Sequence, residues 1–143
     1  ITAISSGSGK TAAACALMAA YQAQNKKVSS CKCGPDYIDP MFHKEVLGVD
    51  SKNLDLFFSS EDELRKEYAK HAADAELVIT EGVMGYYDGM RLDSVTASSY
   101  DVARTLDIPA VLILPCKGAA LSLCAVVSGI VSFQKDSNIQ GSF

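Results

Sequence analysis

Two aspartates on a short turn are the first residues of this chain whose spacing could support chemistry. Residues 32–40, Lys-Cys-Gly-Pro-Asp-Tyr-Ile-Asp-Pro, hold Asp36 and Asp39 three positions apart, and each is next to a proline. Carboxylates on such a stiff turn can bind a hard cation such as Mg²⁺, which prefers oxygen ligands. Lys32, at the end of an expected strand, would add positive charge where a phosphoryl group is transferred. The alternative is a structural turn in which Asp39 caps a following helix.

A second candidate is a phosphate-binding loop at residues 5–11, Ser-Ser-Gly-Ser-Gly-Lys-Thr. The backbone N–H groups expected to turn toward phosphate are those of Gly7, Ser8 and Gly9. Lys10 would reach the outer phosphates of a nucleotide, and the Thr11 hydroxyl would join the shell of Mg²⁺. The match to G-x-x-x-x-G-K-[ST] is partial, because Ile4 stands where the first glycine falls. A plain Gly/Ser loop is the alternative.

A third group of candidates follows the apolar run at residues 77–80. Glu81 would stand at the tip of this strand, where an acid can coordinate Mg²⁺ or position a nucleophile, as Walker-B carboxylates do. Asp88 is a further candidate ligand or substrate contact in the Gly-rich loop that follows. A solvated loop acid is the alternative for both residues. His43 either contacts substrate or is a satisfied histidine at a helix start.

The elements that must position these residues alternate between strand and helix. We expect strands at residues 1–5, 27–33, 76–80 and 110–114, and helices at 11–24, 41–47, 61–73, 98–106 and 119–133, with a further strand beginning near the last residue. The strands are apolar runs, which is typical of a parallel sheet buried on both faces. The pattern predicts an α/β, P-loop NTPase-like three-layer fold with a mostly parallel sheet and helices on both faces. The acidic turn would then face the same crevice as the phosphate loop.

Composition narrows the class of protein. The 143 residues carry a net charge of −4 and no basic stripe, so we expect no nucleic-acid partner. No apolar run reaches the roughly 20 residues that span a bilayer, and no secretory signal is visible. Five cysteines without paired spacing indicate a reducing compartment, so we expect a cytoplasmic protein. Cys31 and Cys33 are expected to be buried packing residues rather than a metal or redox site.

Three segments together resemble the cobyrinic acid a,c-diamide synthases, specifically their N-terminal ATP-dependent synthetase domain, which is similar in fold to dethiobiotin synthetase. They are residues 5–11, Lys-x-Gly-Pro-Asp-Tyr-Ile-Asp-Pro-x-x-His at residues 32–43, and Glu-Gly-Val-Met-Gly-x-Tyr-Asp-Gly at residues 81–89. The chain departs from the family pattern at Ala3, where the family has glycine. We expect residues 1–143 to be one P-loop synthetase domain, truncated at both ends, without the glutamine amidotransferase domain that follows it in the family.

The resemblance implies a reaction in which ATP phosphorylates the a- and c-side-chain carboxylates of a cobyrinic-acid-type corrinoid. Ammonia released from glutamine then displaces phosphate to give amides. ATP and Mg²⁺ are the implied cofactors. The implied catalytic residues are Lys10, Asp39, Glu81 and Asp88; the implied nucleotide-binding residues are Gly7, Ser8, Gly9, Lys10, Thr11 and Lys32. The implied metal ligands are Thr11, Asp39 and Glu81, and the implied substrate contacts are Asp36, Tyr37 and Ile38.

Alternatives to this function are kept open. The substrate could be another tetrapyrrole, such as nickel sirohydrochlorin, since it would offer acidic side chains to the same site. The acidic turn at residues 32–40 argues against a second alternative, a dethiobiotin-type carboxylase. A P-loop partitioning or regulatory ATPase acting as a binding module is the non-enzyme alternative, and a homodimer is one possible assembly. Neither His43 nor His71 lies in a glutaminase motif, so we expect no glutamine hydrolysis by this chain. Because its apolar runs are short, we also expect no membrane partner.

Overall fold

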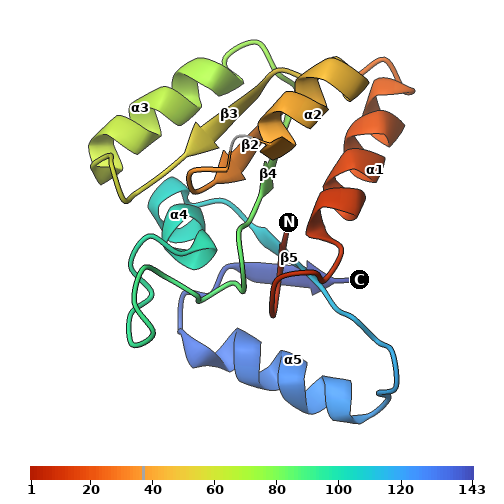
Figure 1. Ribbon diagram of the computed structural model, residues 1–143, viewed down its shortest axis with the longest axis vertical. Coiled ribbons are helices and arrows are strands. Elements are labelled where there is room, and N and C mark those ends of the chain that lie inside the picture. Colours follow the sequence, from red (N-terminus) through yellow and green to blue (C-terminus); the bar gives the residue numbers. More distant parts are fainter. Residues whose placement is uncertain (37) are drawn as a thin grey trace.

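Strands and helices alternate along the chain, as the sequence predicts. The computed structural model describes residues 1–36 and 38–143 (Figure 1). The strands are β1 (Thr2–Ala3), β2 (Val28–Cys33), β3 (Ser51–Leu54), β4 (Leu77–Glu81), β5 (Ala110–Ile113) and β6 (Ile139–Ser142). The helices are α1 (Lys10–Gln22), α2 (Ile38–Leu47), α3 (Glu61–Ala72), α4 (Ser99–Leu106) and α5 (Ser122–Phe133).

The six strands of the described residues form two ladders of three strands each, and every strand pair within them is parallel. One has the order β3-β2-β4 and the other the order β1-β5-β6. The ladders meet at Ile1, whose amino group donates to the Thr80 carbonyl at 2.7 Å and whose carbonyl accepts from Gly82 N at 2.8 Å. These two bonds lie on either side of Glu81, so β1 runs beside β4. The predicted parallel sheet is confirmed in direction, with this narrow junction at its centre.

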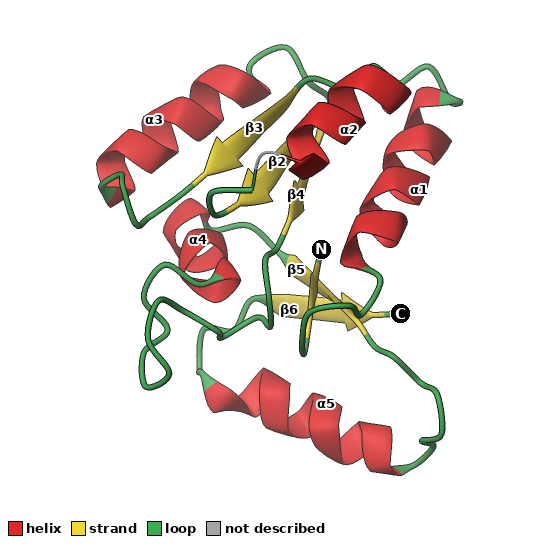
Figure 2. Cartoon of the chain, viewed as in Figure 1, coloured by secondary structure: helices red, strands yellow, loops and turns green. Residues whose placement is uncertain are grey.

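Helices cover both faces of the β3-β2-β4 ladder, which confirms the predicted three layers. Figure 2 shows this ladder between α1 on one side and α3 on the other. Side chains alternate along β2: Cys31 and Cys33 pack in a core cluster with residues of α3 and α4. Ser30 and Lys32 point to the opposite face, toward α2. The cluster under α1 is separate and is built around Ala14, Met18, Val49 and Ile79.

The acidic turn is partly helical, which differs from the prediction. The helix predicted at residues 41–47 begins at Ile38, so Asp39 and Pro40 lie in its first turn. Proline is tolerated there, because the first turn of a helix leaves its N–H groups without helical partners. Asp36 provides the cap: its Oδ1 accepts from the amides of Ile38 at 3.0 Å and of Asp39 at 3.4 Å. The alternative that Asp39 is the capping residue is therefore wrong.

Two other elements differ from the sequence-based expectation. The strand β3 was not predicted, since Lys52 and Asn53 interrupt any apolar run, yet it pairs in register with β2. Helix α5 begins at Ser122 rather than at residue 119 and has no buried residue. Tyr87 connects it to the rest of the molecule, because its hydroxyl donates to the Ile130 carbonyl at 2.8 Å and its ring lies 4.9 Å from that of Phe133.

The cysteines and the helix lengths agree with the compositional reasoning. All five thiols lie in the described residues and are free, and Cys31 and Cys33 are buried as expected. Burial raises the pKa of Cys31 to about 12 and that of Cys33 to about 11. Across the described residues, no helix combines the length and the apolar character that crossing a bilayer requires.

Candidate active site

The phosphate loop has the predicted context of strand, loop and helix. β1 ends at Ala3 and α1 begins at Lys10. Gly7 has φ 72° and Gly9, the N-cap of α1, has φ 90°. Such left-handed conformations favour glycine, because a side chain would be strained there. No atom lies within 4 Å of the place where a Cβ would stand at either position, so the face of the loop is open. A plain Gly/Ser loop can have the same backbone geometry, so the phosphate-binding role of these residues stays a prediction.

Lys10 lies folded against the loop and is nearly buried. Its Nζ donates to the Ser5 carbonyl at 3.0 Å and to the Met84 carbonyl at 2.6 Å. Burial, followed by the charge of Lys32, lowers the pKa of Lys10. The side chain therefore connects the phosphate loop to the loop after β4. Sequence reasoning missed Met84, because its contribution is a backbone carbonyl and leaves no signal in the residue type.

A buried cluster of charges lies at the carboxyl ends of β2 and β4. Lys32 and Glu81 are register partners on these strands, and both are almost completely buried. Lys32 Nζ is 2.8 Å from Glu81 Oε1 and 2.6 Å from Asp39 Oδ2. The Thr11 hydroxyl donates to the same Glu81 oxygen at 2.5 Å. The alternative that Glu81 is a solvated loop acid is wrong, since it is 0% exposed.

Lys32 is the cation that compensates these acids. Burial alone would lower the pKa of Lys32, but its hydrogen bonds to Asp39 and Glu81 act in the opposite direction and the pKa is raised. Asp36 lies at the edge of the cluster, with its Oδ2 3.8 Å from Lys32 Nζ. The topology of the parallel sheet thus brings residues from the phosphate loop, the acidic turn and β4 together, as predicted.

The remaining predicted residues lie around this cluster rather than in it. Ile38 begins α2 and is 79% exposed, and Tyr37 falls outside the described residues. Asp88 is exposed, and its Oδ2 accepts from the amide of Gly85 at 2.8 Å, which closes the loop after β4. Its negative charge opposes the lowering of the Lys10 pKa. Asp88 therefore stands on the Lys10 side of the site and has a structural contact of its own.

His43 lies behind the cluster. It follows Asp39 by one turn of α2 and is 0% exposed, so in this structure it faces the buried Glu81 rather than the open edge of the site. Its Nδ1 is 3.1 Å from Ser30 Oγ, and its Nε2 is 3.7 Å from Glu81 Oε2. Burial is the main cause that lowers the pKa of His43. Its spacing from Asp39 was the only sequence signal that could have placed it beside the acids.

The oxygen atoms of the cluster fit a magnesium ion that is shared with a nucleotide. The described residues contain no group of three or more His, Cys, Asp or Glu arranged to hold a metal alone. Magnesium at nucleotide sites needs only one or two carboxylates, because phosphate oxygens and waters complete its shell. Thr11, Asp39 and Glu81 converge in this way around Lys32 Nζ. Glu81 Oε2 is also buried without a hydrogen-bond partner.

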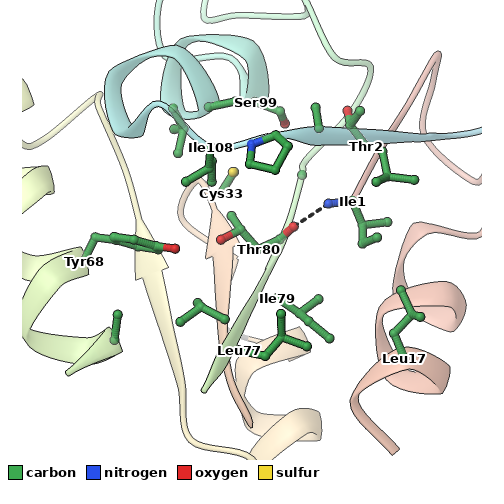
Figure 3. Close-up of a pocket in the computed structure, with 18 of the residues that line it drawn as sticks. Ile1, Thr2, Leu17, Cys33, Tyr68, Leu77, Ile79, Thr80, Ser99 and Ile108 are labelled. Carbon is green, nitrogen blue, oxygen red and sulfur yellow. Dashed lines mark hydrogen bonds between the residues drawn. The ribbon is translucent and has the colours of Figure 1, made fainter. Parts of the chain in front are cut away.

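A large cavity among the described residues lies away from this cluster. It has a volume of about 590 Å³ and lies between β4 and β5. Figure 3 shows apolar side chains such as Leu77 and Ile79 around it, with the bond from Ile1 to Thr80 at its wall. None of the residues predicted to bind nucleotide, metal or substrate lines this cavity. The charged cluster, which carries reactive groups, is therefore the better candidate for an active site.

Comparison with known proteins identifies the family of the chain. The chain is 41% identical to a cobyrinate a,c-diamide synthase of Synechococcus over 136 residues, 95% of the chain and 30% of that relative. It is 42% identical to one of Clostridium acetobutylicum over 137 residues, 96% of the chain and 31% of the relative. The chain thus spans about 30% of the length of these relatives. Residues 1–127 match the family described as the CobQ/CobB/MinD/ParA nucleotide binding domain, and the chain belongs to that family.

Proposed function

We propose that this chain is the nucleotide-binding and carboxylate-activating part of a cobyrinate a,c-diamide synthase. The protein would amidate the a- and c-side-chain carboxylates of a cobyrinic-acid-type corrinoid, using ATP, Mg²⁺ and ammonia from glutamine. One observation carries the proposal: Thr11, Lys32, Asp39 and Glu81 meet at the end of the phosphate loop. The names and identity of the relatives described above support the choice of substrate.

The chemistry that these residues would serve is the activation of a carboxylate. A substrate carboxylate oxygen attacks the γ-phosphorus of ATP, the bond to the bridging oxygen breaks, and ADP leaves. Ammonia then attacks the acyl carbon, and phosphate leaves with the former carboxylate oxygen. A carboxylate is a poor electrophile, so the acyl phosphate supplies the leaving group. In such reactions the protein mainly positions the reactants and neutralises charge.

Each side chain has a role that its position supports. Lys10 would release the Ser5 and Met84 carbonyls and bind the outer phosphates. Lys32 would turn from the carboxylates toward the transferred phosphoryl group. Thr11, Asp39 and Glu81 would hold Mg²⁺, which would neutralise phosphate charge when bound.

The substrate would approach from the outer edge of the cluster. Asp36 and Ile38 form the proposed substrate edge, because Asp36 lies near Lys32 and Ile38 is exposed. Tyr37 is proposed as a substrate contact from the sequence alone. Asp88 would contribute from the opposite side, next to Lys10. Glutamine hydrolysis is assigned to a glutaminase domain outside this chain.

The substrate is tested with the full-length protein. Two reactions are compared, one with cobyrinic acid and one with nickel sirohydrochlorin, and each also contains ATP, Mg²⁺ and ammonia. The masses of the products are measured by mass spectrometry. We expect two carboxyl-to-carboxamide conversions on the corrinoid. Conversion of the nickel compound alone would show that the reaction is the one proposed but that its substrate is another tetrapyrrole. Nucleotide-dependent association without any amidated product would contradict the proposal and favour a regulatory module.

The nucleotide role is tested by titration calorimetry of ATP with Mg²⁺. Lys10→Ala removes the ammonium inside the loop, and we expect it to weaken binding about tenfold or more, since hydrogen bonds to charged groups are worth about 1.5 to 3 kcal/mol. Lys27→Ala is the matched control, because Lys27 is an exposed lysine far along the chain from the loop. Equal affinity of the two variants would contradict the assignment of Lys10.

A further inference from the structure

The two carboxylate oxygens of Glu81 have different surroundings. Oε1 faces the phosphate loop and accepts from Thr11 and Lys32. Oε2 faces the interior and is buried without a hydrogen-bond partner. His43 Nε2, 3.7 Å away, is also buried without a partner. Buried polar atoms are nearly always hydrogen-bonded, so two unpartnered atoms facing each other need an explanation.

The His43 ring is held in place by the sheet. Ser30 and Ser51 are register partners on β2 and β3, and their hydroxyls lie 3.1 Å and 3.3 Å from His43 Nδ1. A hydroxyl can donate to an imidazole nitrogen that carries no hydrogen. The ring hydrogen is then on Nε2, which faces an acceptor-only carboxylate. In the other tautomer Nε2 would present a lone pair to the carboxylate, so the tautomer with the hydrogen on Nε2 is the one that suits these neighbours.

We propose that His43 is a positioning residue for the reaction: its Nε2–H binds the inner oxygen of Glu81 and keeps the outer oxygen aimed at Thr11. The inference rests on the proposed function and adds the group that orients its central acid. A movement of the carboxylate that shortens the distance to about 3 Å would complete the bond. Release of Lys32 from Oε1, which the proposed function requires, would leave the carboxylate free to make that movement.

Matched variants of His43 separate positioning from mere packing. In the full-length protein, the amide of His43→Gln can stand where Nε2 stands, whereas that of His43→Asn reaches only the place of Nδ1. We expect His43→Asn to lower kcat about 10- to 100-fold with an unchanged KM for the corrinoid, as the loss of a residue orienting a ligand does. His43→Gln should retain most of the activity. Equal kcat values for the two variants would overturn the inference.

A second measurement does not depend on turnover. Binding of Mn²⁺, used in place of Mg²⁺, is measured by electron paramagnetic resonance with a non-hydrolysable ATP analogue. We expect weaker Mn²⁺ binding in His43→Asn and near wild-type binding in His43→Gln. If wild type amidates no tetrapyrrole but this difference is present, the proposed function fails and the positioning role stands. An active wild type with no difference between the variants overturns the positioning role alone.

The two serines at His43 Nδ1, Ser30 and Ser51, provide a test if neither His43 variant folds. Ser30→Ala combined with Ser51→Ala removes both hydroxyls that select the tautomer and leaves Glu81 and His43 in place. We expect kcat to fall and Mn²⁺ binding to weaken, because the ring hydrogen is no longer directed to Nε2. Unchanged kcat and Mn²⁺ binding in this double variant would overturn the proposal.

Discussion

Lys32 is the cation paired with Glu81, the buried acid of the site. Glu81 has no exposed surface, and its charge is compensated by the ammonium 2.8 Å away. We expect Lys32→Met to lower the free energy of unfolding by about 3 to 5 kcal/mol, because it leaves a buried charge without a partner. Urea unfolding monitored by circular dichroism measures the change.

Lys26→Met is the control for this variant. Lys26 also forms an ion pair, with Glu76 at 2.8 Å, but about half of each side chain is exposed. Its removal should change the stability little, since solvent already screens the pair. A loss for Lys32→Met no larger than that of Lys26→Met would show that the acids do not need the internal cation.

Thr11 allows a prediction about a single hydroxyl. Its Oγ1 donates to Glu81 at 2.5 Å. We expect Thr11→Val, which keeps the shape, to weaken binding of ATP with Mg²⁺ about tenfold or more, because the hydroxyl that would bind Mg²⁺ is lost. Thr11→Ser keeps the hydroxyl and should bind nearly as wild type. Calorimetry of both variants measures the difference, and identical affinities would contradict it.

At the scale of elements, the loop after β4 is fitted closely against the phosphate loop. A Cβ added at Gly85 would lie 2.7 Å from the Ile4 carbonyl and 2.5 Å from Asp88 Oδ2. We therefore expect Gly85→Ala to push the two loops apart and to lower the free energy of unfolding by about 1 to 3 kcal/mol. ATP binding should weaken as well, because Met84, which holds Lys10, is the preceding residue.

Gly129→Ala is the matched substitution in a helix. Gly129 lies in α5 with no atom within 4 Å of the added methyl group. The substitution should raise the free energy of unfolding by about 0.5 to 1 kcal/mol, because alanine has a higher helix propensity than glycine. Thermal unfolding compares the two variants. Equal effects of the two substitutions would show that the contact at Gly85 can relax.

At the scale of the whole molecule, the buried thiols predict how stability depends on pH. Cys31 and Cys33 have folded pKa values of about 12 and about 11, above the ordinary 9.0. The unfolded chain therefore loses these protons first as the pH rises. The thiol contribution is fully present below pH 9.0 and decreases between pH 9.0 and about 12. At pH 10 we expect a loss of about 1 kcal/mol per thiol.

Cysteine variants check the origin of this slope. The free energy of unfolding is measured in urea at pH 8 and pH 10. Cys31→Ala combined with Cys33→Ala should have a shallower pH dependence than wild type. Cys116→Ala combined with Cys124→Ala should keep the wild-type slope, because these thiols are exposed. The same slope in all three proteins would contradict the prediction.

Much of the fold could be predicted, because its strands are compact apolar runs. β4 and β5 were placed within a residue or two for this reason. β3 could not be predicted, since Lys52 and Asn53 make it look like a loop and only its pairing with β2 defines it. The early start of α2 was also missed, because Asp36 caps it through a side-chain contact. Tertiary pairing and capping decided these elements rather than local propensity.

The residues of the candidate site could be predicted from the sequence, but their burial and their contacts could not. The rule for parallel sheets predicts that Lys32, Asp39 and Glu81 lie at one edge of the sheet. The sequence could not show that Glu81 is wholly buried, or that Asp88 caps its own loop. His43 was left open, since a residue type does not reveal which neighbours surround it. Nucleotide, metal and substrate roles remain predictions for the experiments above.

The place of Lys32 has a consequence for how ligands affect one another. Its ammonium lies against the carboxylate oxygens that the proposed function gives to a divalent cation. Under that proposal, a phosphate that draws Lys32 away would free those oxygens for the cation, and a cation that enters would free Lys32 for phosphate. We therefore expect nucleotide and metal to raise each other's affinity by the same factor, as thermodynamic linkage requires. The interior salt bridge then acts as the coupling element of the site.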